Sequence, residues 1–516
     1  MHASKFLGIA ALVIMCAHSV PLSANPAAAP PPAALRAEIT DRNGVVLATT
    51  AVVASIYADP RHIVNPDATA AALTRLLPGL ERDALQAKLA SAKSFVWIAR
   101  HVNAADVRSV LSLALPGIGV RDESGRIYPQ GPLTAQVVGF TDLESKYGMA
   151  GAESRFDRLL TPGSKTLALS IDVRVQAMVR EELVRAMADF QARGAAGLVL
   201  DVKTSELLAL VSLPDFDPAD RKTINPFGYK DRLTSDLYEL GGVFEIFTTA
   251  AALEQHAVTP KTVVDVTTPL RFSRVTLRDD QPSAIPLSVA DIFSRSSIIG
   301  AARIAERSSL ETLLASLHHL RLLDPMAMDG AQTIARPIAH PANGSRLDRG
   351  VVGYGYGIAV SPLQAAVVAT GIVNHGVLVA PTLLRSEAAG TIGETRIVGE
   401  QTSAEMRALL RRAVSAGTGA AADVPGLAVG GKTGTSLKPI AGRYAQNRRL
   451  TWFFAGFPMN DAPRYTLLIM LDEPHGVDAT RGLATSQWNA VPTAGRIIAR
   501  LARLPGWAPS AQLAAR

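Results

Sequence analysis

The stretch "GLVLDVKTSELLALVSL", residues 197–213, consists of two apolar runs that flank a short polar turn. Both runs have the length and composition of β-strands, and the turn at 203–205 joins them as a hairpin that lacks the expected glycine. A second pair of apolar runs, "TWFFAGF" at 451–457 and "YTLLIMLD" at 465–472, repeats this arrangement near the end of the chain. The two hairpins predict antiparallel β-structure in the C-terminal part of the protein.

Helical segments lie between and beside these hairpins. In "SIDVRVQAMVREELVRAMADFQARG", Asp172 can cap a long amphipathic helix that ends at Gly194. In "SPLQ", Ser361 is placed as an N-cap and Gln364 as the residue that reaches back to it in a capping box. Helices mixed with antiparallel strand pairs predict the α+β class.

The first part of the mature chain is expected to be rich in β-structure. Asn43-Gly44 lies between two strand-like runs, which is a strong hairpin signal because both turn positions favour positive φ. The other predicted features are helical periodicity at 68–90 and 104–113, a strand at 93–102, and repeated Gly and Pro punctuation at 116–132. We therefore place a separate module here, with a boundary at Pro162-Gly163.

Composition narrows the possible functions. The chain has 516 residues, enough for more than one domain, and Lys and Arg exceed Asp and Glu by 52 to 45. This excess is spread along the chain without basic runs or interleaved aromatic residues, which argues against nucleic-acid binding. The only cysteine is Cys16, so intramolecular disulfides and zinc sites built on cysteines are excluded. His318, His319 and His340 are not paired with carboxylates at helical spacing, so no metal and no cofactor is predicted.

The N-terminus carries an export signal. An apolar run from Phe6 to Cys16 follows Lys5 and is too short to span a bilayer. We predict a signal peptide or short anchor at 1–24, a Pro/Ala linker at 25–35, and a periplasmic location. Cleavage after "LSA" and retention as an inner-membrane anchor remain alternatives.

Several blocks together resemble the class B penicillin-binding proteins, especially the septal, cell-division D,D-transpeptidases that crosslink peptidoglycan. The blocks run in family order from Arg36 to Arg503: "DRNGVVLA", "YPQGPLTAQVVGFTD", "GAESRFDRLL", "LSIDVRVQ", "VLDVKTSELLALVSLPDFDP", "SVADIFSRSSIIGAARIAE", "GYGYGIAVSPLQAA" and "GGKTGTS". The resemblance implies an N-terminal dimerisation or pedestal domain at 36–162, a β-lactamase-like transpeptidase domain at 163–505 with an antiparallel sheet between helical layers, and a tail at 506–516.

The family's first motif is a serine followed three residues later by a lysine on one helix face, where the amine takes the hydroxyl proton. In "YELGGVFEIFTTAAALEQ", residues 238–255, the matching positions are Gly242 and Glu245. Glycine supplies no nucleophile, and a carboxylate cannot supply the charge of the lysine. The resemblance therefore implies a site without its acylating residue.

The second and third motifs are kept in part. The Ser-x-Asn motif aligns with Ser296 and Ile298, so the serine is present and the asparagine is replaced. The Lys-Thr-Gly motif is intact as Lys432, Thr433 and Gly434, followed by Thr435, and in the family this edge strand receives the substrate carboxylate and peptide. Because the two motif lysines of the family face each other, we expect Glu245 to form an ion pair with Lys432. The backbone N–H groups of Gly242 and Thr435 could still form an oxyanion hole.

Plain structural explanations exist for the same residues. Glu245 suits the first turn of a helix, and Gly242 is a tolerable cap. Ser296 near a helix start is more often a cap than a proton relay, and Ile298 is most simply a core residue.

Three functions follow from these alternatives. The first is a catalytically inactive, penicillin-binding-protein-like scaffold or regulator of peptidoglycan synthesis and cell division. Its partners would be a stem peptide or β-lactam, held weakly by Lys432 and Thr433, and other cell-wall or cell-division proteins. The second is an active D,D-transpeptidase that uses atypical residues. The third is a slow peptidase in which Glu245 activates water.

Overall fold

A computed structural model describes residues 35–161, 163–220, 230–272, 275–329, 332–339, 346–386, 393–440 and 443–507. The predicted signal segment, Pro162 at the predicted domain boundary, His340 and most of the predicted tail lie outside these ranges. Within them, no helix has both the length and the apolar character needed to cross a bilayer.

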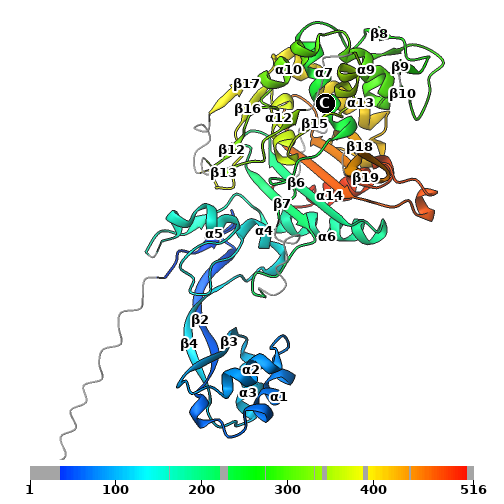
Figure 1. The fold of residues 1–516 in the computed structure, drawn as a ribbon. Helices are drawn as coiled ribbons and strands as arrows, with labels where there is room; N and C mark the ends of the chain where they lie inside the picture. The colour runs from blue at the N-terminus through cyan, green and yellow to red at the C-terminus, as the bar shows by residue number, and fades with distance from the viewer. Residues whose placement is uncertain are drawn as a thin grey trace, which may run out of the picture.

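The N-terminal module is built on one long strand. Strand β2 (Val46–Ala58) pairs with β4 (Ile118–Ile127) over ten residues and with β3 (Val96–Val102) at its far end. At its near end, β2 pairs with β1 (Ile39–Thr40) across the predicted Asn43-Gly44 turn, which confirms that hairpin. In Figure 1 the β2–β4 ribbon forms a stalk between a small distal lobe and the rest of the molecule.

The distal lobe has its own core. Helices α1 (Pro66–Leu76), α2 (Arg82–Leu89) and α3 (Ala104–Ser112) cover the far end of the sheet, so the helical pattern at 68–90 forms two helices. The Gly and Pro punctuation at 116–132 gave no sign of β4, which occupies most of that range. The strand is hard to detect because its residues "IGVRDESGRI" are mostly polar and only partly buried.

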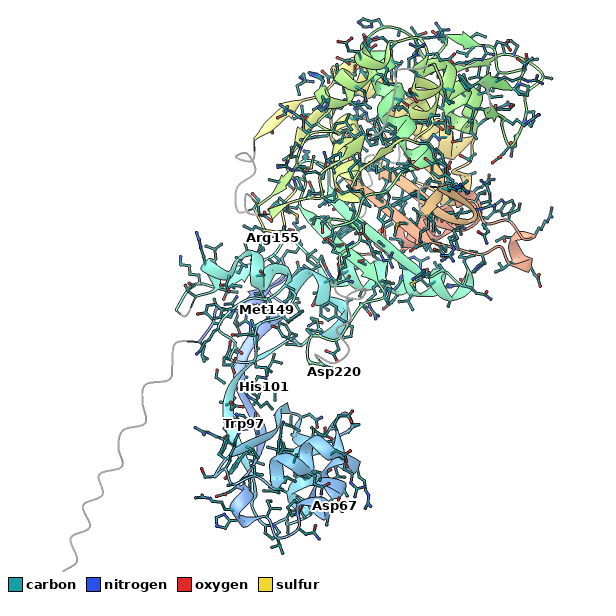
Figure 2. The ribbon with its side chains drawn as sticks, in the orientation of Figure 1. Asp67, Trp97, His101, Met149, Arg155 and Asp220 are labelled. Carbon is teal, nitrogen blue, oxygen red and sulfur yellow. The ribbon has the colours of Figure 1, made fainter. Side chains whose placement is uncertain are left out.

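A buried charge cluster closes the near end of the N-terminal module, beside its junction with the C-terminal domain. Glu153, on α5 (Gly151–Arg155), is fully buried and accepts hydrogen bonds at 2.7 Å from both Arg36 and Arg126. Strand β5 (Leu167–Ala168) then pairs in parallel with β1. Figure 2 shows Arg155 at this junction, where its guanidinium lies 3.6 Å from the Asp329 carboxylate.

The C-terminal domain is organised around a five-stranded sheet. The order is β18-β19-β20-β6-β7, and all neighbouring pairs are antiparallel. The strands are β6 (Gly194–Asp201), β7 (Leu207–Leu213), β18 (Gly430–Ile440), β19 (Arg443–Phe457) and β20 (Tyr465–Asp472). Both predicted hairpins are confirmed, and Ser205, with φ of 52°, takes the left-handed conformation that glycine would otherwise supply.

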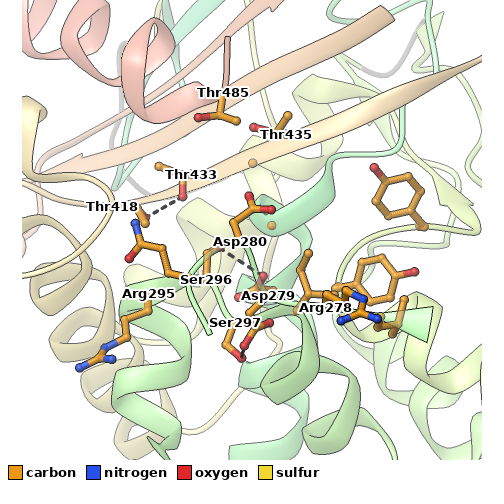
Figure 3. Close-up of a pocket in the computed structure, with 18 of the residues that line it drawn as sticks. Arg278, Asp279, Asp280, Arg295, Ser296, Ser297, Thr418, Thr433, Thr435 and Thr485 are labelled. Carbon is orange, nitrogen blue, oxygen red and sulfur yellow. Dashed lines mark hydrogen bonds between the residues drawn. The ribbon is translucent and has the colours of Figure 1, made fainter. Parts of the chain in front are cut away.

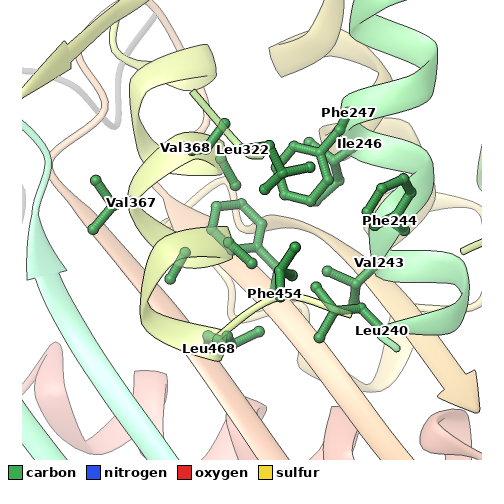
Figure 4. Packing of buried hydrophobic residues seen from close by; sticks show 14 of the residues in the cluster. Leu240, Val243, Phe244, Ile246, Phe247, Leu322, Val367, Val368, Phe454 and Leu468 are labelled. Atoms are coloured by element: carbon green, nitrogen blue, oxygen red, sulfur yellow. The ribbon is translucent and has the colours of Figure 1, made fainter. Parts of the chain in front are cut away.

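Each face of this sheet supports a separate core. Helices α6 (Val173–Asp189) and α14 (Ala490–Leu501) pack on one face with Phe453, whereas α12 (Pro362–Val373) and α7 (Glu245–Glu254) pack on the other with Phe454. Successive strand residues thus alternate between the two cores, as the period of a strand requires. Figure 4 shows the second core, where Phe454 and Leu468 meet Phe247 and Val368.

The remaining elements complete the helical layers and connections. They are α4 (Ala135–Val138), α8 (Val289–Arg295), α9 (Ile298–Ala305), α10 (Leu310–His319), α11 (Arg346–Gly353), α13 (Glu400–Ser415), β8 (Val263–Val264), β9 (Leu270–Phe272), β10 (Val275–Leu277), β11 (Leu287–Ser288), β12 (Ala327–Met328), β13 (Gln332–Thr333), β14 (Ile338–Ala339), β15 (Ile358–Ala359), β16 (Val377–Val379), β17 (Glu394–Arg396), η1 (Pro60–His62), η2 (Gly131–Leu133), η3 (Asp157–Leu160), η4 (Gly241–Phe244), η5 (Ala420–Ala422), η6 (Asp478–Thr480) and η7 (Ser486–Trp488).

One predicted helix end and one predicted capping contact are wrong. Helix α6 ends at Asp189, and Gly194 instead begins β6, because Gln191 with φ of 49° already turns the chain out of the helix. Ser361 caps α12 as predicted by accepting from the Gln364 N–H at 3.1 Å. The Gln364 side chain does not reach back, because its amide donates to the carbonyl oxygens of Arg321, Leu322 and Asp324.

Candidate active site

The segment that carries Gly242 is packed tightly against the edge of the sheet. Gly242 lies in η4, a short 3-10 helix that precedes α7 and contacts β18. A Cβ atom at position 242 would lie 2.6 Å from the backbone oxygen of Thr433 and 2.9 Å from the Ser296 hydroxyl. A side chain at this position therefore requires η4 and β18 to move apart.

The expected ion pair between Glu245 and Lys432 is present. Glu245 Oε2 lies 3.2 Å from Lys432 Nζ, and the two side chains are 3% and 0% exposed. Lys432 Nζ also donates to the hydroxyl of Ser296, and that hydroxyl lies 3.4 Å from Glu245 Oε1. The three side chains form a closed network in which the charge of the lysine is neutralised inside the cleft.

Burial shifts both members of this pair away from their charged forms. Desolvation raises the pKa of Glu245 to about 6, although the Lys432 cation opposes this shift. Desolvation also lowers the pKa of Lys432, opposed by the Glu245 carboxylate. At neutral pH the ion pair therefore forms at the cost of removing both charged groups from water.

The second motif has a different role from the cap suggested by its position. Ser296 ends α8 in a left-handed conformation, with φ of 57°, and turns its hydroxyl into the cleft. Its neighbour Ser297 is the N-cap of α9, accepting from the Gly300 N–H at 3.0 Å and donating to Asp279 at 2.6 Å. Ser296 is thus the C-cap residue of α8, and the N-cap of the following helix is Ser297 instead. Ile298 is half-buried against the core and lines the cleft, where it presents no polar group.

The third motif lies on the edge strand, as the family pattern implies. Lys432, Thr433, Gly434 and Thr435 follow one another on β18, which pairs with β19 on one side only. Figure 3 shows Thr433 bonded to Thr418, with their hydroxyls 2.8 Å apart, and Thr435 facing the same cleft. The outer edge of β18 can therefore accept an extended peptide as an added strand.

Sequence reasoning missed several residues that shape the cleft. Thr418 bonds Thr433, Asp279 holds the start of α9, and the Tyr356 hydroxyl accepts from the Leu437 N–H at 3.0 Å. None of them belongs to a three-residue motif, and each meets its partner across a large sequence separation. Only Tyr356 lies within one of the family blocks, "GYGYGIAVSPLQAA".

The cleft between these elements is large. Its volume is about 760 Å³, within the range of pockets that hold small molecules or short peptides. Its lining includes all the predicted site residues except the buried Lys432, namely Gly242, Glu245, Ser296, Ile298, Thr433, Gly434 and Thr435. Among the residues that the structure describes, no group of three or more His, Cys, Asp or Glu side chains is placed to hold a metal ion.

Comparisons with known proteins agree with this architecture. The penicillin-binding protein transpeptidase domain model matches residues 195–496, and the penicillin-binding protein dimerisation domain model matches residues 31–161. The chain is 36% identical over 485 residues to the probable peptidoglycan D,D-transpeptidase FtsI of Caulobacter vibrioides, covering 91% of this chain and 81% of the relative. It is 28% identical over 474 residues to the peptidoglycan D,D-transpeptidase FtsI of Escherichia coli, covering 85% and 79%.

Solved structures show the same fold. Penicillin-binding protein 3 from Mycobacterium tuberculosis, in complex with aztreonam, matches with a TM-score of 0.69 and 23% identity, covering 91% of this chain and 96% of that one. A peptidoglycan synthetase from Bifidobacterium adolescentis matches with a TM-score of 0.68 and 20% identity, covering 91% and 95%.

Proposed function

Since the chain belongs to the class B penicillin-binding proteins, we propose that it is a member of the cell-division type that has lost acyl transfer and acts as a scaffold or regulator of peptidoglycan synthesis. The family's chemistry needs a hydroxyl on residue 242 and an amine three residues later. The chain has glycine and glutamate there, while the surrounding fold is kept. The observation that carries the proposal is the close packing of Gly242, where a Cβ would meet the Thr433 oxygen at 2.6 Å, so that any side chain requires η4 and β18 to move apart.

The Glu245–Lys432 ion pair supports the same conclusion. A general base must be able to take a proton from a nucleophile that stands beside it. Here the only amine of the network is buried and paired with a carboxylate at 3.2 Å. The third alternative, water activation by Glu245, is disfavoured for the same reason, because its carboxylate is buried and engaged by Lys432 and Ser296.

One observation favours a second candidate. The Ser296 hydroxyl accepts a hydrogen bond from Lys432 and lies 2.9 Å from the place where a Cβ on residue 242 would stand. A serine beside a buried amine is the arrangement of a serine–lysine dyad. An active D,D-transpeptidase that uses atypical residues would therefore act through Ser296.

Location and partners complete the proposal. The predicted export signal supports a periplasmic protein, either free after cleavage or held by a short anchor. The cleft and the open edge of β18 support weak, non-covalent binding of a stem peptide or β-lactam. The dimerisation-type N-terminal module supports binding to other cell-wall or cell-division proteins.

Intact-protein mass spectrometry after incubation with a penicillin tests the proposal. We expect no added mass on the natural chain and one antibiotic adduct on the Gly242→Ser, Glu245→Lys, Ile298→Asn variant. The matched control is Ser296→Ala in the otherwise natural chain. An adduct on the natural chain that disappears in Ser296→Ala would overturn the proposal and establish the second candidate.

A further inference from the structure

A second cavity lies in the same domain as the cleft. Its volume is about 430 Å³, and it shares no lining residue with the cleft. It forms where the start of β6, the end of β20, the segment before η4 and the outer part of β18 meet. Its lining residues are Arg193, Lys230, Arg232, Asp236, Leu237, Tyr238, Lys438 and Asp472. We call this cavity the basic pocket.

Positive charge prevails in the basic pocket. Four of its lining side chains are cationic and two are carboxylates, so the lining carries a net charge of +2. The overall excess of the chain is only +7 over 516 residues, so this small cavity holds a large share of it. Concave sites with one sign of charge concentrate ions of the opposite sign.

Both carboxylates of the lining are already engaged. Asp472 accepts from Lys438 at 2.7 Å through one oxygen and from Arg232 at 3.0 Å through the other. Asp236 contacts Lys230 and accepts from the Tyr238 hydroxyl at 2.9 Å. The negative charge of each carboxylate is therefore already balanced by a lysine or arginine of the lining.

Arg193 is the cationic side chain of the lining that pairs with neither Asp236 nor Asp472. Its side chain is exposed, and among the described residues no carboxylate lies within ion-pair distance of it, although its charge helps to lower the pKa of the nearby Glu473. The nearby Glu473 is occupied by Lys438 at 2.7 Å and by Arg448 at 3.7 Å. Arg193 can thus bind an external anion without breaking an internal ion pair.

The pocket is held in shape before any ligand arrives. A Cβ on Gly194 would lie 2.9 Å from Nη2 of Arg232, so the guanidinium lies directly over the glycine backbone at the start of β6. The backbone N–H of Arg232 donates to Ser212 at 3.1 Å. The Arg232 and Lys438 side chains are only 15% and 23% exposed, so they have already lost much of their hydration. Such preorganised, partly dehydrated cations bind anionic oxygens strongly.

These features select the class of ligand. The excess of two charges matches a compact anion with at least two negative charges, and the guanidinium groups match its several acceptor oxygens. Neutral sugars and single carboxylates leave part of the charge unbalanced. We propose that the basic pocket binds a phosphate-bearing anion, as a free phosphate or as a lipid-linked one. This site is independent of whether the cleft is catalytic.

Calorimetric titration of the full chain with sodium pyrophosphate, at constant ionic strength, tests the proposal. We expect one bound pyrophosphate per chain, and about tenfold weaker binding in both Arg193→Glu and Lys230→Glu, since each reverses one charge beside the anion. The matched control is Arg108→Glu, which makes the same change on exposed helix α3 of the distal lobe and should leave affinity unchanged.

Sedimentation with phosphatidylglycerol vesicles separates the two sources of phosphate. Pyrophosphate binding that depends on Arg193 supports a free anion, and vesicle binding that depends on Arg193 supports a lipid-linked one. Binding to neither probe would overturn the proposal, as would equal losses of affinity in Arg193→Glu and Arg108→Glu. Because Arg193 is exposed, its variant should keep the melting temperature of the natural chain within about 2 °C.

Discussion

Glycine at position 242 does more than remove a hydroxyl. Because residue 242 has no Cβ, η4 packs close against β18. The Thr433 backbone oxygen and the Ser296 hydroxyl lie 2.6 Å and 2.9 Å from the position that a Cβ would take. Restoring a single serine is therefore not the reverse of losing it. The neighbouring strand must also move.

We expect Gly242→Ser alone to lower the free energy of unfolding by about 1–3 kcal/mol, because the new Cβ meets a backbone atom at 2.6 Å. Chemical denaturation of the two chains measures this difference. Gly393→Ala is the control, since a Cβ there meets nothing within 4 Å. Equal stability of Gly242→Ser and the natural chain would show that η4 can move at no cost.

Glu245 makes the stability of the fold depend on pH. Burial raises its pKa from 4.5 to about 6, so the folded chain holds this proton more tightly than the unfolded chain. Stability is therefore lost as the pH rises through this window. Relative to Glu245→Gln, which cannot ionise, we expect the natural chain to lose about 2 kcal/mol between pH 4 and pH 7. Denaturant titrations at several pH values measure this, and parallel curves for the two chains would contradict it.

The residues differ in how far the sequence predicts them. The Glu245–Lys432 pair follows from motif positions alone, because the family geometry brings those positions together. The contacts of Thr418, Asp279 and Tyr356 do not, because each depends on packing between segments that are distant in the chain. Ser296 lines the cleft, as its predicted motif position implies, but its left-handed conformation has no signal in a non-glycine residue.

Among the elements, the strongly patterned ones were the predictable ones. The hairpins β6–β7 and β19–β20 are apolar on both faces because helices cover both. Each strand therefore appears in the sequence as a continuous run of apolar residues. Strand β4 gives no sequence signal because it is only partly buried and rich in polar residues. The end of α6 is misplaced because Gln191, rather than a glycine, turns the chain.

Helix α5 ties the two ends of the N-terminal module together through Glu153. We expect Glu153→Gln to lower the free energy of unfolding by about 3 kcal/mol, because it leaves Arg36 and Arg126 buried without their shared anion. Glu144→Gln is the control, since its pair with Arg100 is half-exposed and should contribute little to stability. Thermal or chemical unfolding compares the two, and similar losses would show that the buried cluster is replaceable.

At the scale of the whole molecule, the cores do not follow a simple division near residue 162. Residues from Ala37 to Leu47 and from Val137 to Ile171 belong to the same apolar core as the C-terminal domain. The distal lobe, between Ile56 and Val120, has a separate core. The predicted boundary at 162 thus remains a prediction about sequence modules, while the packing suggests that the distal lobe is the independent unit.

This packing predicts two unfolding units. Leu73→Ala, in the fully buried core of the distal lobe, should raise hydrogen exchange in α1, α2 and α3 by a local destabilisation of about 2–5 kcal/mol and leave β18 unchanged. Leu240→Ala, in the larger core beside η4, should show the opposite pattern. Loss of protection in β18 caused by Leu73→Ala would mean that the molecule unfolds as one unit.

The stalk has a mechanical consequence. Between the distal lobe and the junction, β2 and β4 run as a two-stranded ribbon with no third strand from Thr49–Ile127 to Val53–Glu123, a length of about 14 Å. A ribbon of this kind twists more readily than a wide sheet, because no third strand stiffens it. A torque on the distal lobe would therefore twist this ribbon first. Its near end is held by Arg126 on β4, which is fixed by the buried Glu153, so the twist would concentrate between that cluster and the distal lobe.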